Sequence, residues 1–116
     1  MTSKITGRSI LIVEDEPLIA MEVVEAFKAA GAVVTATFLF KQALILVEHD
    51  GLAAAILDHA LGGSDSSRLC ARLKERGVPF VIYTGFSNIK GHCADGPLVQ
   101  KPAPATELIA TVEALL

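Results

Sequence analysis

The sequence predicts an α/β protein built on one doubly wound parallel sheet. Short continuous apolar runs alternate along the chain with segments whose apolar residues recur at helical spacing. Unbroken runs such as Ile10–Val13 are typical of strands covered on both faces, and alternation with helices favours a parallel sheet. With 116 residues, 52% of them hydrophobic, the chain is expected to form a single domain over residues 1–116.

Strand-like and helix-like segments alternate along the chain. The five expected strands cover residues 10–13, 32–37, 53–57, 79–83 and 97–100. Pro17 opens the first helix and Gly31 follows its end, as proline and glycine commonly do. The second helix is expected over 40–50, the third from a cap at Ser64 or Asp65 to Gly77, and the last from Pro104.

The helical signal fails between Thr84 and Pro97. The segment GFSNIKGHCADG contains three glycines and only two large apolar residues, Phe86 and Ile89. Glycine weakens a helix, and so few large apolar residues cannot form the apolar face that a packed helix needs. We therefore expect a loop or one irregular turn here, so that the fourth crossover helix is short or absent.

Composition argues against several classes of function. Ten Lys and Arg residues face thirteen Asp and Glu residues, and the scattered basic residues form no run typical of a nucleic-acid-binding domain. No stretch approaches the roughly 20 apolar residues of a membrane span. The apolar run Ile10–Val13 is too short for a signal peptide. These features favour a cytoplasmic protein with no nucleic-acid or membrane partner.

The two cysteines show no CxxC spacing. Cys70 and Cys93 are 23 residues apart, and the three histidines are dispersed, so no zinc site is predicted. Reduced thiols in a reducing compartment are the simplest interpretation. We expect Cys70 to be a small core residue and Cys93 to lie in the irregular segment.

Polar residues stand at the ends of four predicted strands. Glu14 and Asp15 follow the first strand, Asp58 the third, Thr84 the fourth and Lys101 the fifth. In such sheets, ligands bind outside the carboxyl ends of the strands, so these side chains are expected to converge at one edge.

This set of residues suits phosphoryl transfer. Three neighbouring acids repel one another and need a cation, and Mg2+ prefers oxygen ligands. The carboxylate of Asp58 is of the type that forms an aspartyl-phosphate. The Lys101 ammonium would neutralise phosphoryl charge and the Thr84 hydroxyl would donate a hydrogen bond.

Four motifs now point to a known family. The runs LIVEDEPLIAME, AAAILD, YTG and VQKP occur in this order, and each spans or follows a predicted strand. Together they resemble the receiver domain of two-component response regulators, over about residues 8–116. The resemblance implies a flavodoxin-like five-stranded sheet in the order 2-1-3-4-5.

The resemblance also implies a role for each matching residue. Asp58 matches the phosphoacceptor. Glu14 and Asp15 match the acidic pair that binds Mg2+ together with Asp58 and the backbone carbonyl of Ala60. A sensor histidine kinase or a histidine phosphotransfer protein would be the phosphoryl donor. The protein would be a phosphoacceptor that catalyses its own phosphorylation, rather than an enzyme.

Thr84 and Lys101 match the remaining two residues of the family's phosphorylation site. Thr84 matches the hydroxyl that turns toward the phosphoryl group. Lys101 matches the lysine that the family follows with a cis bond to proline, here Pro102.

Several positions depart from the family pattern. Leu98 stands where an aromatic residue is usual, and residues 62–67 lack the common proline-containing turn. The run PFVIYTGFS resembles a subgroup of single-domain receivers with a Phe-Ala-Thr-Gly-type motif. Since the chain ends at Leu116, output is expected by protein contact or as a phosphate sink or relay. Ala60 and Phe86 have no polar side chain to orient water, so slow autodephosphorylation is expected.

Other interpretations stay open at this point. Glu14, Asp15 and Glu16 are also what the positive end of a helix dipole favours. A flavin or nucleotide binder is disfavoured because no Gly-rich loop follows the first strand. A pseudo-receiver that never takes phosphate is a second rival. A metal-dependent phosphatase with an aspartyl nucleophile usually needs a second acid at the place of Ala60.

Overall fold

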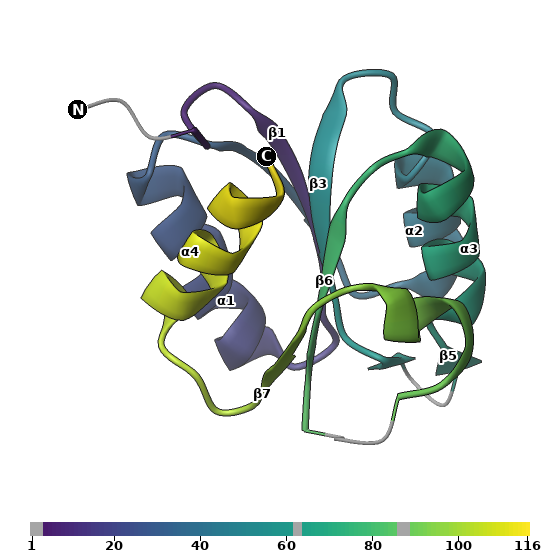
Figure 1. Ribbon diagram of the computed structural model, residues 1–116. Coiled ribbons are helices and arrows are strands. Elements are labelled where there is room, and N and C mark those ends of the chain that lie inside the picture. Colours follow the sequence, from purple (N-terminus) through teal and green to yellow (C-terminus); the bar gives the residue numbers. More distant parts are fainter. Residues whose placement is uncertain (1–3, 62–63, 86–88) are drawn as a thin grey trace.

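A five-stranded parallel sheet forms the centre of the protein (Figure 1). The computed structural model describes residues 4–61, 64–85 and 89–116. The strand order is β2-β1-β3-β6-β7, which confirms the expected order 2-1-3-4-5. The five strands are β1 (Ser9–Val13), β2 (Val33–Thr37), β3 (Leu52–Leu57), β6 (Phe80–Thr84) and β7 (Leu98–Gln100), and every neighbouring pair is parallel.

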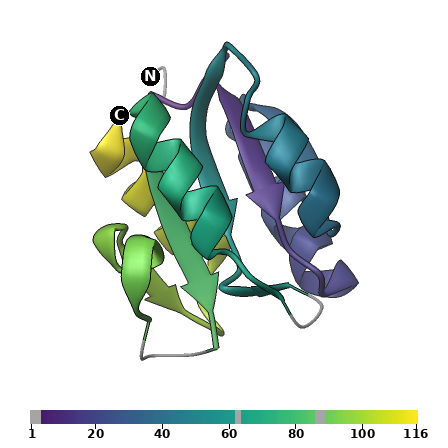
Figure 2. The same cartoon turned by 90° about the vertical axis from the view of Figure 1, so that its right-hand side faces the viewer.

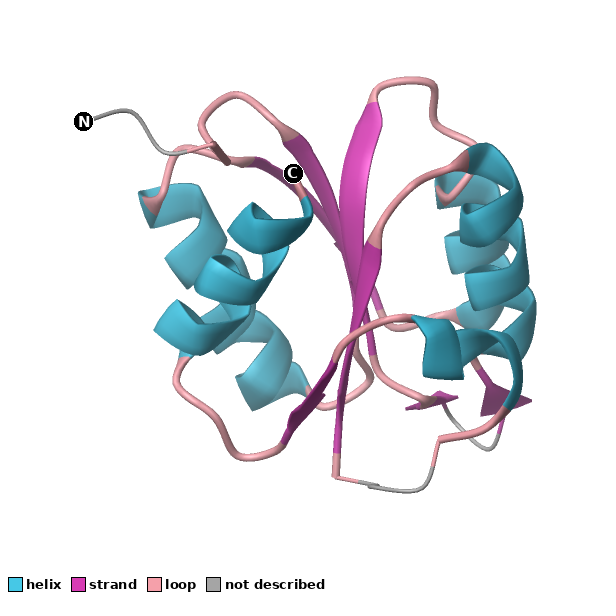
Figure 3. Ribbon diagram, in the orientation of Figure 1, coloured by secondary structure: helices cyan, strands magenta, loops and turns pink. Residues whose placement is uncertain are grey.

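Helices cover both faces of this sheet (Figure 3). α1 (Pro17–Ala29) and α4 (Ala105–Leu115) pack on one face, and α2 (Phe40–Leu46) and α3 (Ser67–Arg76) pack on the other. Along β1, Ile10 and Ile12 point toward α1 and α4, whereas Leu11 and Val13 point toward α2 and α3. The apolar runs of the three inner strands β1, β3 and β6 are unbroken because helices cover these strands from both sides, whereas the edge strands β2 and β7 are partly exposed.

Two helices have an end that differs from the predicted one. α2 ends at Leu46 rather than near residue 50, and the Arg76 guanidinium donates hydrogen bonds to the carbonyls of Val47 and His49 just beyond it. The predicted cap of α3 at Ser64 or Asp65 is wrong. Both residues lie in β5 (Ser64–Asp65), which pairs with β4 (Ala60–Leu61) in an antiparallel ribbon, and Ser66 is the N-cap residue.

A short 3-10 helix, η1 (Gly91–Asp95), stands between β6 and β7 in place of a full crossover helix. The expectation of a short fourth helix is therefore confirmed. η1 packs against α3, so that α3 lies between α2 and η1 (Figure 2).

The expectation of two reduced cysteines was wrong. Cys93 of η1 and Cys70 of α3 form a disulfide, with an S–S distance of 2.06 Å and 5.1 Å between the Cα atoms. Both residues are buried. The spacing of 23 residues carries no local signal, since the pairing depends on η1 folding back onto α3. In the chain-entropy description, a cross-link over that separation stabilises the fold by about 3 kcal/mol.

No helix within the described residues is long and apolar enough to cross a membrane.

Gly96, which follows η1, lies in close contact with Phe80 of β6. A Cβ at this position would lie 2.5 Å from the Phe80 ring and 2.8 Å from the Phe80 carbonyl oxygen. Because the carbonyl belongs to a central strand, Gly96→Ala is expected to destabilise the fold by about 1–3 kcal/mol in urea unfolding. Gly51→Ala is the matched control, because its Cβ would meet nothing closer than 3.6 Å. Equal stability of the two variants would contradict this packing.

Candidate functional site

Lys101 brings the acidic residues together at the carboxyl edge of the sheet. Its ammonium nitrogen lies 2.7 Å from Glu14 Oε1, 3.2 Å from Asp58 Oδ2 and 3.6 Å from Glu16 Oε1. The side chains of Lys101, Glu14 and Asp58 are only 11%, 4% and 7% exposed. Ion pairs at this degree of burial are screened much less by solvent than surface pairs.

Backbone hydrogen bonds between neighbouring strand ends hold these residues in place. The Asp58 N–H donates to the Val13 carbonyl at 2.9 Å, and the Lys101 N–H donates to the Thr84 carbonyl at 2.8 Å. The Ser66 hydroxyl donates to the carbonyl of Asp58 and so ties the start of α3 to this residue. The peptide bond between Lys101 and Pro102 is cis, as the resemblance implied.

A pocket of about 580 Å3 opens over this edge. It is lined by Asp15, Glu16, Ile19, Asp58, Thr84, Gly85, Lys101 and Pro102. The structure therefore places Asp15, Asp58, Thr84 and Lys101 around one pocket, and Glu14 reaches the same place through its contact with Lys101. Ala60 begins β4, two residues beyond Asp58.

Sequence reasoning missed two contributions to this site. Glu16 is the N-cap residue of α1; its N–H donates to Glu14 Oε2 at 3.1 Å, and its carboxylate faces Lys101. Its only signal was that it is the third acid in a row. Tyr83 is the other: Lys101 Nζ lies 5.5 Å from the centre of its ring. The Tyr83 hydroxyl donates to the carbonyl of Ala103 and accepts from its N–H, both at 3.2 Å.

The carboxylates form a set suited to a hard cation. Glu14, Glu16 and Asp58 each offer an oxygen atom, and these atoms lie within 4.8 Å of one another. The Lys101 ammonium faces all three. The negative charge left over and the all-oxygen donors fit a divalent ion such as Mg2+.

Burial shifts the titration of two of these groups. Burial raises the pKa of Glu14 to about 7, because the hydrogen bond from Lys101 only partly offsets the lost hydration and the neighbouring Asp58 adds repulsion. For Lys101, burial lowers the pKa, but hydrogen bonds and attraction from Glu14 and Asp58 outweigh it, and the pKa is raised.

The family model of the response regulator receiver domain matches residues 10–113. The chain belongs to this family. It is thus a receiver domain of the type used in two-component signal transduction.

Individual relatives agree with this assignment. The chain is 30% identical over 119 residues to the transcriptional regulatory protein TcrA of Mycobacterium tuberculosis, which covers 97% of this chain and 47% of TcrA. This receiver domain thus spans about half the length of the curated relatives it matches.

Two solved structures are also informative. SdrG from Sphingomonas melonis Fr1 is 37% identical, with a TM-score of 0.79 over 94% of this chain and 96% of SdrG. A response regulator protein from Burkholderia pseudomallei shares the fold at 20% identity, with a TM-score of 0.79 over 90% of this chain and 66% of the other. That crystal structure contains a phosphorylated aspartic acid, a calcium ion and citrate.

The raised pKa of Glu14 predicts how stability depends on pH when divalent ions are chelated. The folded state holds a proton on Glu14 up to about pH 7, whereas the ordinary value is 4.5. The contribution of protonated Glu14 to the free energy of unfolding is therefore complete below about pH 4.5, and it is lost as pH rises through 7. In EDTA, wild-type unfolding free energy should fall by up to about 3 kcal/mol over this range on account of Glu14.

Glu14→Gln should remove this part of the pH dependence, as measured by urea unfolding at pH 5 and pH 8. Glu22→Gln, which changes an exposed carboxylate on α1, is the control and should keep the wild-type dependence. The same slope in Glu14→Gln and wild type would contradict the assignment.

Proposed function

We propose that Asp58 accepts a phosphoryl group from the phosphohistidine of a sensor histidine kinase or a histidine phosphotransfer protein. The observation that carries this proposal is the position of Asp58, which lines the 580 Å3 pocket with Thr84 while its carboxylate contacts Lys101 at 3.2 Å. A buried carboxylate facing an open pocket, with a cation held beside it, has what a nucleophile toward phosphorus needs.

Three side chains have separate roles in the phosphoryl transfer. An Asp58 carboxylate oxygen forms a bond to phosphorus as the phosphorus–nitrogen bond breaks, and the electron pair leaves with the imidazole nitrogen. Lys101, already 3.2 Å from Asp58 Oδ2, neutralises the phosphoryl oxygens. The Thr84 hydroxyl donates a hydrogen bond to one of them.

Mg2+ is proposed as the cofactor at this site. Its ligands would be the carboxylates of Glu14, Asp15 and Asp58 and the backbone carbonyl of Ala60, with Glu16 as a further carboxylate of the same cluster. When bound, the ion supplies positive charge that offsets the charge of the phosphoryl oxygens. The calcium ion in the Burkholderia response regulator structure is consistent with a divalent ion in this fold.

The output of the switch is proposed to be protein contact, or service as a phosphate sink or relay. Leu98 stands where the family usually has an aromatic residue, and it is 41% exposed. We therefore propose that Thr84 is not coupled to a rotating aromatic side chain here. Membership of the Phe-Ala-Thr-Gly-type subgroup stays a prediction, and Phe86 of that motif lies outside the described residues.

Phosphorylation of Asp58 is tested by intact-mass measurement after incubation with acetyl phosphate. Wild type should gain one phosphoryl group only when Mg2+ is present, and Asp58→Asn should gain none. Asp50→Asn is the matched control, because Asp50 is a fully exposed aspartate far from the pocket, and it should behave like wild type. No gain at any Mg2+ concentration would favour a pseudo-receiver instead.

The metal ligands are tested by the Mg2+ concentration that half-saturates this reaction. Loss of one carboxylate ligand should raise it by about tenfold or more, so Asp15→Asn is expected to do so. Glu16→Gln is measured beside it, to show which of these two neighbouring acids is the metal ligand. A large effect of Glu16→Gln together with no effect of Asp15→Asn would mean that Glu16 holds the ligand position.

Slow loss of the phosphoryl group is expected once acetyl phosphate is removed. The side chain at position 60 is a methyl group, which cannot orient an attacking water molecule. Ala60→Asn should therefore shorten the phosphorylated lifetime several-fold, which is less than the roughly 100-fold or more that a positioned general acid or base contributes, because an amide only orients the water. Rapid loss in wild type that Ala60→Asn leaves unchanged would refute this.

A further inference from the structure

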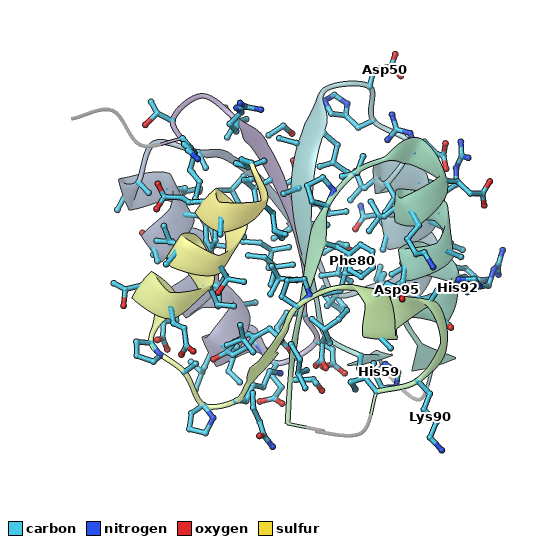
Figure 4. All side chains as sticks on the ribbon, in the orientation of Figure 1. Asp50, His59, Phe80, Lys90, His92 and Asp95 are labelled. Atoms are coloured by element: carbon cyan, nitrogen blue, oxygen red, sulfur yellow. A yellow bond between two sulfur atoms is a disulfide. The ribbon has the colours of Figure 1, made fainter. Side chains whose placement is uncertain are left out.

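The contacts of η1 with α3 include a covalent bond and an ion pair. The covalent contact is the disulfide between Cys70 and Cys93. Beside it, the Lys74 ammonium pairs with the Asp95 carboxylate and lies 3.4 Å from His92 Nδ1. Asp95 and His92 both belong to η1 (Figure 4). The side chains of Lys74 and Asp95 are 39% and 59% exposed, and ion pairs of this kind contribute little. The disulfide is therefore the stronger of the two contacts.

The disulfide also closes an apolar part of the core. Cys70 and Cys93 belong to the same buried cluster as Leu73 and Phe80, and Gly96 at the end of η1 lies directly against Phe80. η1 has only five residues, and its N-cap residue Lys90 makes no side-chain capping hydrogen bond. The hydrogen-bond geometry of a 3-10 helix is poorer than that of an α-helix, and native proteins open locally at their less stable segments.

We propose that Cys70 and Cys93 form a reversible redox site, whose state determines how firmly η1 is held on α3. The reductant is a dithiol. One of its thiolates attacks a cysteine sulfur to form a mixed disulfide, and its second thiolate then releases that cysteine. Two electrons and two protons pass to the cysteines, which become thiols, while the dithiol becomes a disulfide. Because both residues are buried, the exchange takes place through local opening of η1.

Cys93, one of the two residues of the redox site, lies on the chain between two residues of the pocket. η1 follows β6, which ends at Thr84, and precedes β7, which leads to Lys101. The Lys101 N–H and the Thr84 carbonyl are themselves hydrogen-bonded. In the oxidised protein, a shift of Thr84 toward a phosphoryl group is restrained through the cross-linked η1. Reduction removes this restraint, so the reduced receiver phosphorylates faster; this consequence rests on the proposed function.

Reversibility is measured first, on the whole chain under native conditions. Dithiothreitol followed by iodoacetamide should add two carbamidomethyl groups to the folded protein. Reduction should also raise amide hydrogen exchange in residues 89–98 by about tenfold or more, while β1 and α1 stay unchanged. No alkylation, equal exchange in the two redox states, or a rise throughout the chain would overturn the redox site.

Two variants separate the cross-link from the packing around it. Cys70→Ala/Cys93→Ala should show the fast exchange of residues 89–98 with and without dithiothreitol. Lys74→Gln removes only the ion pair with Asp95, and should keep the slow exchange of the oxidised wild type. Fast exchange in oxidised Lys74→Gln would show that the ion pair, and not the disulfide, holds η1. If the double variant does not fold, the proposal is decided by hydrogen exchange in the oxidised and reduced forms of wild type and of Lys74→Gln.

The link to the pocket is measured by the rate of mass gain with acetyl phosphate and Mg2+. Reduced wild type should phosphorylate at least about threefold faster than oxidised wild type. The double variant should match the reduced rate in both conditions. Equal rates would refute the coupling to the pocket. If no form gains a phosphoryl group, the proposed function fails, while the exchange measurement still decides on the redox site.

Discussion

The site depends on one ammonium held among carboxylates. Lys101 contacts Glu14, Asp58 and Glu16 at 2.7, 3.2 and 3.6 Å, and the two closest carboxylates are almost fully buried. Removing such charges from water is costly, and mutual attraction offsets this only where the geometry is good. The parallel sheet supplies that geometry, because the ends of β1, β3 and β7 are fixed by hydrogen bonds between neighbouring strands. One lysine against three acids still leaves negative charge for a divalent ion to neutralise.

Much of this arrangement follows from patterns that are local in the sequence. The apolar runs predict the strands, and the rule that parallel strands present their carboxyl ends at one edge brings Asp58, Thr84 and Lys101 to one place. Glu14 converges there too, whereas local reasoning about Glu16 stopped at its position before α1. Its second role depends on the approach of Lys101, which is 85 residues away in sequence and is set by the sheet.

Other features of the fold have no local signal. The hydroxyls of Ser66 and Tyr83 bond to backbone groups that only the tertiary structure brings near, the carbonyl of Asp58 and both polar groups of Ala103. The same holds for the disulfide. A glycine-rich, helix-poor segment correctly predicts a short connection, but its attachment to α3 follows from the packing of η1 beside Phe80. In this receiver a cross-link stands where a longer helix would otherwise cover the sheet.

The edge strand β2 is exposed and uncharged. It lies at the end of the sheet, and residues 32–40 (AVVTATFLF) contain no charge and no proline. Val33, Phe38 and Leu39 are 59%, 64% and 52% exposed. Proteins usually protect such edges with lysine, proline or a bulge, since an open strand of β-branched residues is a template for pairing between chains. This edge is therefore open to pairing with a second chain at high concentration, and a single lysine at the exposed position of Thr35 would protect it.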